Sequence, residues 1–172
     1  KLYERLGGRL SYLHKAVSIW NKYSEERNVS IDTVYNEVVG QAELEIKQAL
    51  SKALGECNKL KIGIIESVLE EERLEKANQS EFKYKTVYEM QKSIIEKQLC
   101  SMQEVASGMI EFLDHNVLRV TKDLTLHSYD KLTQEFFTTD EWPSLKAVLE
   151  KTINQSIVGG ETNASGGWNK CT

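Results

Sequence analysis

The sequence from Ser30 to Leu69 reads SIDTVYNEVVGQAELEIKQALSKALGECNKLKIGIIESVL, and this stretch decides the fold class. Its apolar side chains recur at steps of three and four residues, which places them on one face of an α-helix. The members of this stripe are Val39, Ala42, Ile46, Ala49, Ala53, Cys57, Leu60, Ile64 and Val68. Ser30 is a suitable N-cap, and Asp32 places a carboxylate in the first turn, where the helix dipole favours it. The pattern predicts one long, straight helix, which Gly55 and Gly63 bend without breaking.

Helical stripes also run through the rest of the chain. An N-terminal helix is predicted from an apolar face made of Leu6, Leu10, Leu13, Val17 and Trp20. A second long helix is predicted from Tyr84, Val87, Ile95, Leu99, Met102, Val105, Met109, Leu113, Val117, Val120 and Leu124, continuing to Leu132 and Phe136. Its expected bends are Gly108 and residues 114–116. A short last helix is predicted after an N-cap at Asp140, with Pro143 tolerated in the first turn.

These segments predict an all-α fold. Polar residues 21–28 and 77–80 are the expected reversals, although nothing in 76–82 forbids continuous helix. We therefore expect an elongated, coiled-coil-like antiparallel bundle of three to four helices over residues 1–158. Two of its helices would be long, each roughly 60 Å. Residues 159–172 are rich in glycine, asparagine and serine, which predicts a flexible tail or linker.

Composition excludes several classes of protein. The 172 residues are 40% hydrophobic and 28% charged, enough for one domain with its own core. The net charge of −4 has the wrong sign for a general nucleic-acid binder, so no nucleic-acid partner is expected. No apolar run approaches the roughly 20 residues of a membrane span. The start at Lys1 resembles no signal peptide, and we expect an excised or processed fragment.

The residues that could take part in catalysis form no recognisable motif. The glycine-rich phosphate loops, the nucleophile elbow and the zinc-protease motif are all missing from the sequence. No glutamate stands three residues before His14, His115 or His127, which argues against a carboxylate-bridged metal pair. Cys57 and Cys100 fall on apolar stripes, whereas Cys171 is a candidate reactive thiol or disulfide partner. We expect no catalytic, cofactor-binding or metal-binding residues, no cofactor, and a chain that is not an enzyme.

One short motif occurs more often than expected. Sequons for N-glycosylation begin at Asn28, Asn78, Asn154 and Asn163. Asn28 and Asn78 fall in the two predicted reversals, and Asn163 falls in the tail. Asparagine and serine are also ordinary turn residues, which is the alternative explanation. The excess favours a glycoprotein that is secreted or held at the cell surface, with a cytoplasmic location as the alternative.

The first functional hypothesis is a non-enzymatic helical interaction domain that binds a protein partner, as the ectodomain of a surface or secreted protein would. A second is a dimeric, BAR-like cytosolic module that shapes or tethers membranes; it rests on helix length alone, and the net charge disfavours it. A third is a bundle that senses a small molecule. The sequence leaves the oligomeric state open.

Overall fold

The computed structural model describes residues 2–7, 9–23, 29–55, 59–77, 82–98, 100–139 and 141–161, with side chains up to 155. This part of the chain is mostly helical, as the all-α prediction requires, with one small sheet. The helices are α1 (Leu2–Arg5), α2 (Leu10–Tyr23), α3 (Ile31–Leu54), α4 (Lys59–Ala77), α5 (Val87–Gln98), α6 (Met102–Asp114), α7 (Lys131–Thr138) and α8 (Glu141–Glu161). The strands are β1 (Leu118–Val120) and β2 (Leu126–Ser128). The described residues form eight helices, so the predicted bundle of three to four helices is not confirmed.

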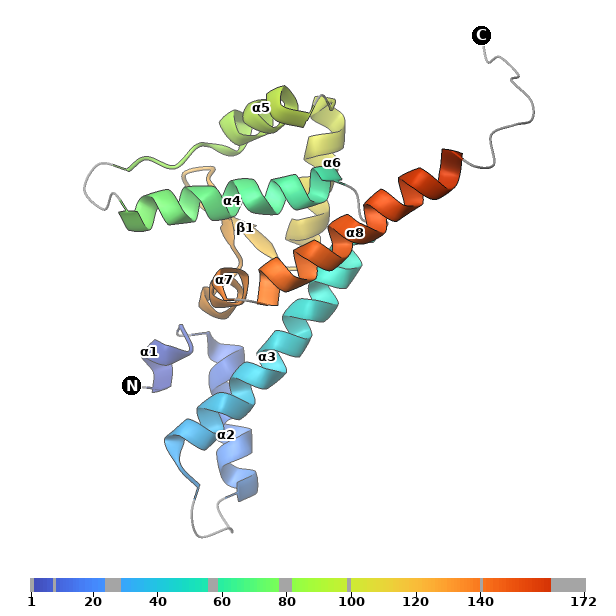
Figure 1. Cartoon of the computed structure of the whole chain (residues 1–172). Coiled ribbons are helices and arrows are strands. Elements are labelled where there is room, and N and C mark those ends of the chain that lie inside the picture. The colour runs from blue at the N-terminus through green and yellow to red at the C-terminus, as the bar shows by residue number, and fades with distance from the viewer. Residues whose placement is uncertain are drawn as a thin grey trace.

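The helices are arranged around α3 (Figure 1). Helix α2 runs antiparallel along the first part of α3, and α4, α5, α6 and the β-hairpin gather at its other end. Helix α7 and the start of α8 lie between these two parts, and α8 then extends away from the rest. The tail predicted from residue 159 lies, beyond Glu161, outside the described residues.

The predicted long helix from Ser30 is two helices. Its start is confirmed, because the Ser30 hydroxyl accepts a hydrogen bond from the Thr33 amide (3.0 Å). It ends at Leu54, because Gly55 adopts a positive φ of 48°. Glycine adopts such a φ with little steric cost, and for this reason it commonly ends helices. The Lys61 ammonium group then donates to the carbonyls of Ala53 and Leu54, 3.0 and 2.9 Å away, and so satisfies the end of α3. The expectation of an unbroken helix was wrong at Gly55.

The second long helix is also interrupted. Helix α6 begins at a capping box, in which Ser101 and Glu104 bond each other's backbone amides. It ends at the predicted bend, where Asn116 takes a positive φ of 56°. The chain then forms an antiparallel hairpin that pairs Leu118 with Ser128, Arg119 with His127 and Val120 with Leu126. The predicted helical stripe through Val120 and Leu124 was therefore wrong.

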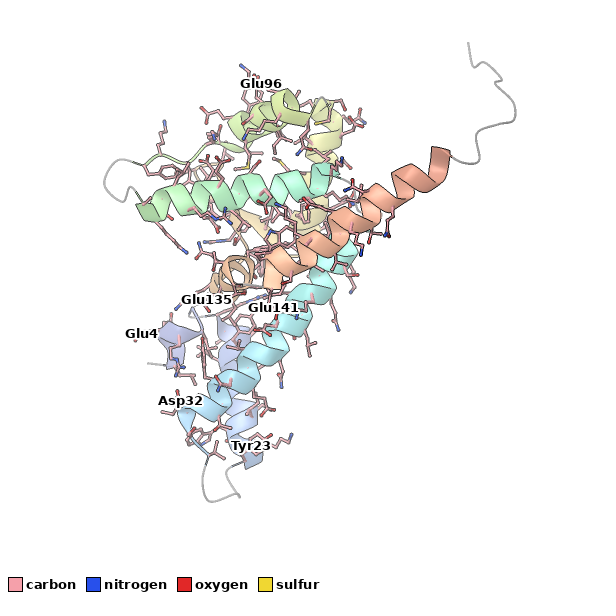
Figure 2. All side chains as sticks on the ribbon, in the orientation of Figure 1. Glu4, Tyr23, Asp32, Glu96, Glu135 and Glu141 are labelled. Carbon is pink, nitrogen blue, oxygen red and sulfur yellow. The ribbon has the colours of Figure 1, made fainter. Side chains whose placement is uncertain are left out.

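Helix α8 is fastened to the core at its first turn. Its backbone begins at Glu141 with Pro143 in the first turn, as predicted, while Asp140 lies outside the described residues. Trp142 is fully buried, its indole N–H donates to Glu66 on α4 (2.8 Å), and its ring packs edge-on against Phe137. Glu141 lies beside α3 (Figure 2), where Lys47 pairs with it at 2.7 Å. The first turn of α8 is thereby held against α3, α4 and α7.

Candidate functional site

Helix α2 leaves an apolar face uncovered. Leu10, Val17 and Trp20 are 65%, 58% and 44% exposed, and Leu13 is half-buried. The spacing of three and four residues aligns these four side chains, called here the α2 stripe, in one row along the helix. They were predicted to be core together with Leu6, and only Leu6 is fully buried.

The buried face of α2 is the neighbouring one, formed by Tyr12, Ala16 and Ile19. Small Ala16 allows α2 to lie close against α3, and the Tyr12 hydroxyl donates to Asp130 at the start of α7 (3.1 Å). A helix with two apolar faces can bury only one against a single partner helix. The α2 stripe is the face that remains.

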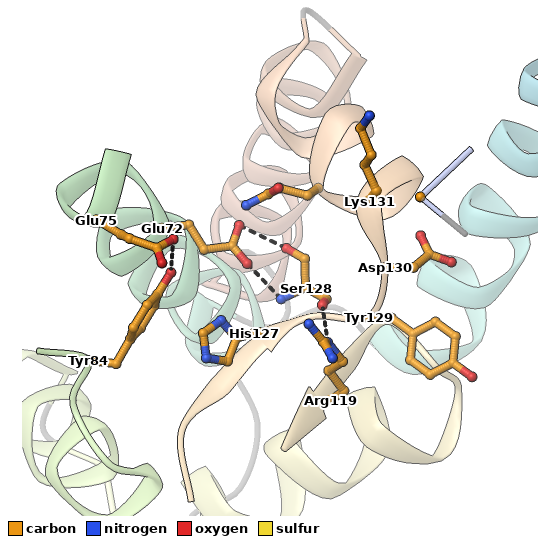
Figure 3. Close-up of a pocket in the computed structure, with 11 residues that line it drawn as sticks. Glu72, Glu75, Tyr84, Arg119, His127, Ser128, Tyr129, Asp130 and Lys131 are labelled. Carbon is orange, nitrogen blue, oxygen red and sulfur yellow. Dashed lines mark hydrogen bonds between the residues drawn. The ribbon is translucent and has the colours of Figure 1, made fainter. Parts of the chain in front are cut away.

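A second candidate site is a polar cavity of about 570 Å³ beside the hairpin (Figure 3). We call it the hairpin cavity. Helix α4 contributes two carboxylates, the hairpin contributes a cross-strand pair of basic side chains, and the turn into α7 completes the wall. The residues lining it are Gly7, Glu72, Glu75, Tyr84, Arg119, His127, Ser128, Tyr129, Asp130, Lys131 and Gln134.

Two of its carboxylates hold the fold together. Glu72 is only 3% exposed, and its two oxygens accept hydrogen bonds from the backbone amide and hydroxyl of Ser128, at 2.8 and 3.0 Å. Asp130 caps α7 by accepting from the amide and hydroxyl of Thr133, while its other oxygen accepts from Arg9 and Tyr12. The cavity wall therefore rests on charge-assisted bonds that are already complete.

The hairpin cavity also contains a pair of stacked aromatic rings. The rings of Tyr84 and His127 lie 4.2 Å apart, and the Tyr84 hydroxyl donates to Glu75 at 2.7 Å. Nε2 of His127 is 2.9 Å from the Thr125 hydroxyl. Burial lowers the pKa of His127 below its ordinary value, partly offset by nearby Glu72. Burial and the bond to Glu75 raise the pKa of Tyr84. Both rings are therefore neutral at physiological pH.

Serine, histidine and glutamate meet in this cavity without the connections of a hydrolytic triad. A triad requires the histidine to bond the serine hydroxyl and the carboxylate to orient the histidine. Here the Ser128 hydroxyl bonds Glu72 directly, and Nε2 of His127 faces Thr125. The arrangement can hold a polar ligand, whereas it does not activate Ser128 as a nucleophile.

The residues singled out in the sequence are not brought together. Asn154 is exposed on α8, Cys100 is a half-buried free thiol, and His115 caps the end of α6. The other sequence-predicted positions, Asn28, Asn78, Asn163, Cys57 and Cys171, lie outside the described residues. Reasoning from the sequence missed the hairpin cavity, although the alternating polarity of Leu124, Thr125, Leu126 and His127 was a strand signal.

Comparison with known proteins adds no assignment, because no protein-family model, curated protein or solved structure matches this chain. Among the described helices, none has the length and apolar character needed to cross a membrane. Across the same described residues, His, Cys, Asp and Glu side chains form no group of three or more that could hold a metal ion.

Proposed function

We propose that this chain is a non-enzymatic helical interaction domain that binds an amphipathic helix of a partner protein through the α2 stripe. The observation that carries the proposal is the row of exposed apolar side chains from Leu10 to Trp20 on a helix whose other apolar face is already buried. Uncovered apolar surface of this kind favours burial against a partner.

The shape of the stripe favours a helix as its occupant. Leu10 and Trp20 are separated by about 15 Å along the helix axis, at 1.5 Å per residue. A single row of that length matches the ridge that a partner helix presents at positions i, i+3 and i+7. Trp20 at one end is the residue type that most often dominates the binding energy of such interfaces.

The chemistry beside the stripe favours a protein over a lipid surface. Helices that lie in a membrane interface carry many Lys and Arg residues on their polar face. Following α2 around from the stripe, the next positions are His14, Ser18 and Asn21. The charged side chains of α2 itself are Lys15, which is paired with Glu45 on α3, and Lys22. Two lysines, one of them already paired, make no cationic face for anionic lipid, whereas the apolar face of a partner helix needs none. The BAR-like alternative rests on long helices, whereas the longest described helix has 24 residues.

The test begins with a photo-crosslinking amino acid placed at Val17 and, as the matched control, at Leu44, which is 61% exposed on α3. The partner crosslinked only from position 17 is identified, produced as a recombinant protein and titrated against the full chain. We expect Val17→Ser and Trp20→Ser to weaken this binding by about tenfold or more, and Leu44→Ser to leave it unchanged. Equal binding by all variants would refute the proposal.

Two other occupants are separate outcomes of the same variants. Sedimentation that shows a dimer lost on Val17→Ser would identify a second copy of the chain as the occupant. Flotation with anionic phosphatidylserine vesicles that is lost on Val17→Ser would identify a membrane. Either result replaces the proposed partner helix.

The proposal includes exposure of the domain outside the cell as a glycoprotein. Its support is the set of four sequons, of which the one at Asn154 lies on an exposed position of α8. Treatment of the native protein with peptide N-glycosidase should lower its intact mass, and Asn154→Gln should remove one glycan. An unchanged mass would instead support the cytoplasmic location.

A further inference from the structure

The polar groups of the hairpin cavity divide into those that the fold already uses and those that it leaves available. Both oxygens of Glu72 and both oxygens of Asp130 accept hydrogen bonds from the protein. The ammonium group of Lys131 donates to the carbonyl of Glu4 (3.0 Å) in the direction of α1. These three charges serve the fold.

Arg119 and Glu75 are the charged groups with capacity left. Arg119 uses Nε for the carbonyl of Ser128 (3.3 Å), and its two terminal amino groups bond no described residue. Glu75 accepts the Tyr84 hydroxyl on one oxygen, and its second oxygen has no partner among the described side chains. One strong donor and one strong acceptor therefore remain in the same cavity.

These two groups lie at opposite ends of the wall that the rings of Tyr84 and His127 form. Arg119 lies directly across the hairpin from His127, and Tyr84 stacks on His127 while bonding Glu75. Figure 3 shows Glu75 and Arg119 on opposite sides of the His127 ring. A bound molecule can lie along this wall and reach both charges.

The balance of charge selects the class of ligand. Three carboxylates and two permanent cations line the cavity, so a simple anion meets repulsion from Glu75 and a simple cation meets repulsion from Arg119. A molecule that carries both charges pairs with both groups. A volume of about 570 Å³ lies within the range of pockets for small molecules.

We propose that the hairpin cavity binds a small zwitterion, whose anionic group pairs with Arg119 and whose ammonium group pairs with Glu75. The site is separate from the α2 stripe and does not depend on the protein partner. Guanidinium pairs with a carboxylate through two parallel hydrogen bonds, which gives the Arg119 end its selectivity for planar anions.

The experiment is isothermal titration calorimetry on the full chain with two zwitterions of different length, γ-aminobutyrate and ε-aminocaproate. Each is compared with its single-charge analogues, which are butyrate and butylammonium for the first and caproate and hexylammonium for the second. We expect saturable binding of at least one zwitterion, with its single-charge analogues about tenfold or more weaker. Absence of saturable binding for both zwitterions, or equal affinity for an analogue, would overturn the proposal.

Variants then assign the two ends of the ligand. Arg119→Gln and Glu75→Gln should each weaken zwitterion binding by about tenfold or more, and Arg119→Gln should strengthen rather than weaken binding of the alkylammonium analogue, because it removes the repulsion between two cations. Arg73→Gln and Glu96→Gln are matched controls, because both side chains are exposed and line none of the described cavities. Figure 2 shows Glu96 on the outer side of α5. Unchanged affinity in both cavity variants, with melting temperatures preserved, would refute the assignment.

Discussion

Two adjacent buried carboxylates join segments that are far apart in the sequence. Glu71 and Glu72 on α4 are 2% and 3% exposed. Consecutive helical residues point about 100° apart, so each reaches a different neighbour. Glu71 accepts from the amide and ammonium groups of Lys85, and Glu72 accepts from Ser128. One helix thereby fixes both the segment before α5 and strand β2.

Replacing Glu72 tests this role. Glu72→Gln keeps the shape of the side chain and turns an amide NH₂ toward a donor on Ser128, which leaves buried polar groups unsatisfied. We expect a loss of about 1–3 kcal/mol in the free energy of unfolding, measured by urea titration. Glu70→Gln is the control, since Glu70 is exposed and its pair with Lys97 is 3.6 Å long; it should change stability by less than about 0.5 kcal/mol. Equal effects of both changes would contradict the role of Glu72.

His127 should make stability depend on pH on the acidic side. Its pKa is lowered in the folded state by burial, so the unfolded chain takes up a proton at this residue first as the pH falls. Stability is therefore unaffected by His127 well above about pH 6.5 and decreases as the pH falls below that value. We expect His127→Gln to reduce the fall in melting temperature between pH 7.5 and 5.5. An unchanged fall in His127→Gln would contradict this prediction.

At the scale of elements, α2 shows that a stripe does not reveal which face is buried. Ile19 is 5% exposed and Val17 is 58% exposed, only two residues apart. We expect Ile19→Ser to cost about 2–4 kcal/mol, because it removes buried apolar surface and buries a hydroxyl. Val17→Ser should stay within about 0.5 kcal/mol. Chemical denaturation of both variants checks this, and a large loss in Val17→Ser would mean that the stripe is core after all.

Substitutions at two glycines should distinguish the end of α3 from its interior. Gly55 has a φ of +48°, which a Cβ strains, so Gly55→Ala should destabilise the chain by about 1–2 kcal/mol. Gly40 is helical with nothing within 4 Å of an added Cβ, so Gly40→Ala should stabilise it by about 0.5–1 kcal/mol. Opposite signs in urea unfolding are the expected result. The same sign for both would mean that α3 continues through position 55.

At the scale of the molecule, one contiguous core joins the α2–α3 pair to the hairpin and α8. Buried side chains extend from Tyr12 and Val38 through Ile64 and Phe112 to Trp142. A single core predicts cooperative unfolding. In a Trp20→Phe variant, the fluorescence of the remaining tryptophans and the far-ultraviolet circular dichroism should give the same urea midpoint. Two separated midpoints would show that the α2–α3 pair unfolds independently.

The sequence by itself determined the helical character, the helix start at Ser30, a change of direction at residues 114–116, where α6 in fact ends, and the position of Pro143 in the first turn of α8. These features depend on local side-chain chemistry and on the three-to-four-residue period, both of which act within a few residues. The break at Gly55 and the capping box at Ser101 were also local, but an apolar stripe continued across both, so the period alone was misleading.

Only the tertiary structure decided which apolar face of α2 is buried and where the polar cavity lies. The face of α2 that carries Tyr12 packs on α3 and meets Asp130 at the start of α7, more than a hundred residues away, while the α2 stripe stays exposed. Glu72 and Ser128 meet across 56 positions, and the hairpin sets Arg119 opposite His127. Such pairings depend on how helices and strands pack in space, and the periodicity of a single segment carries no information about them.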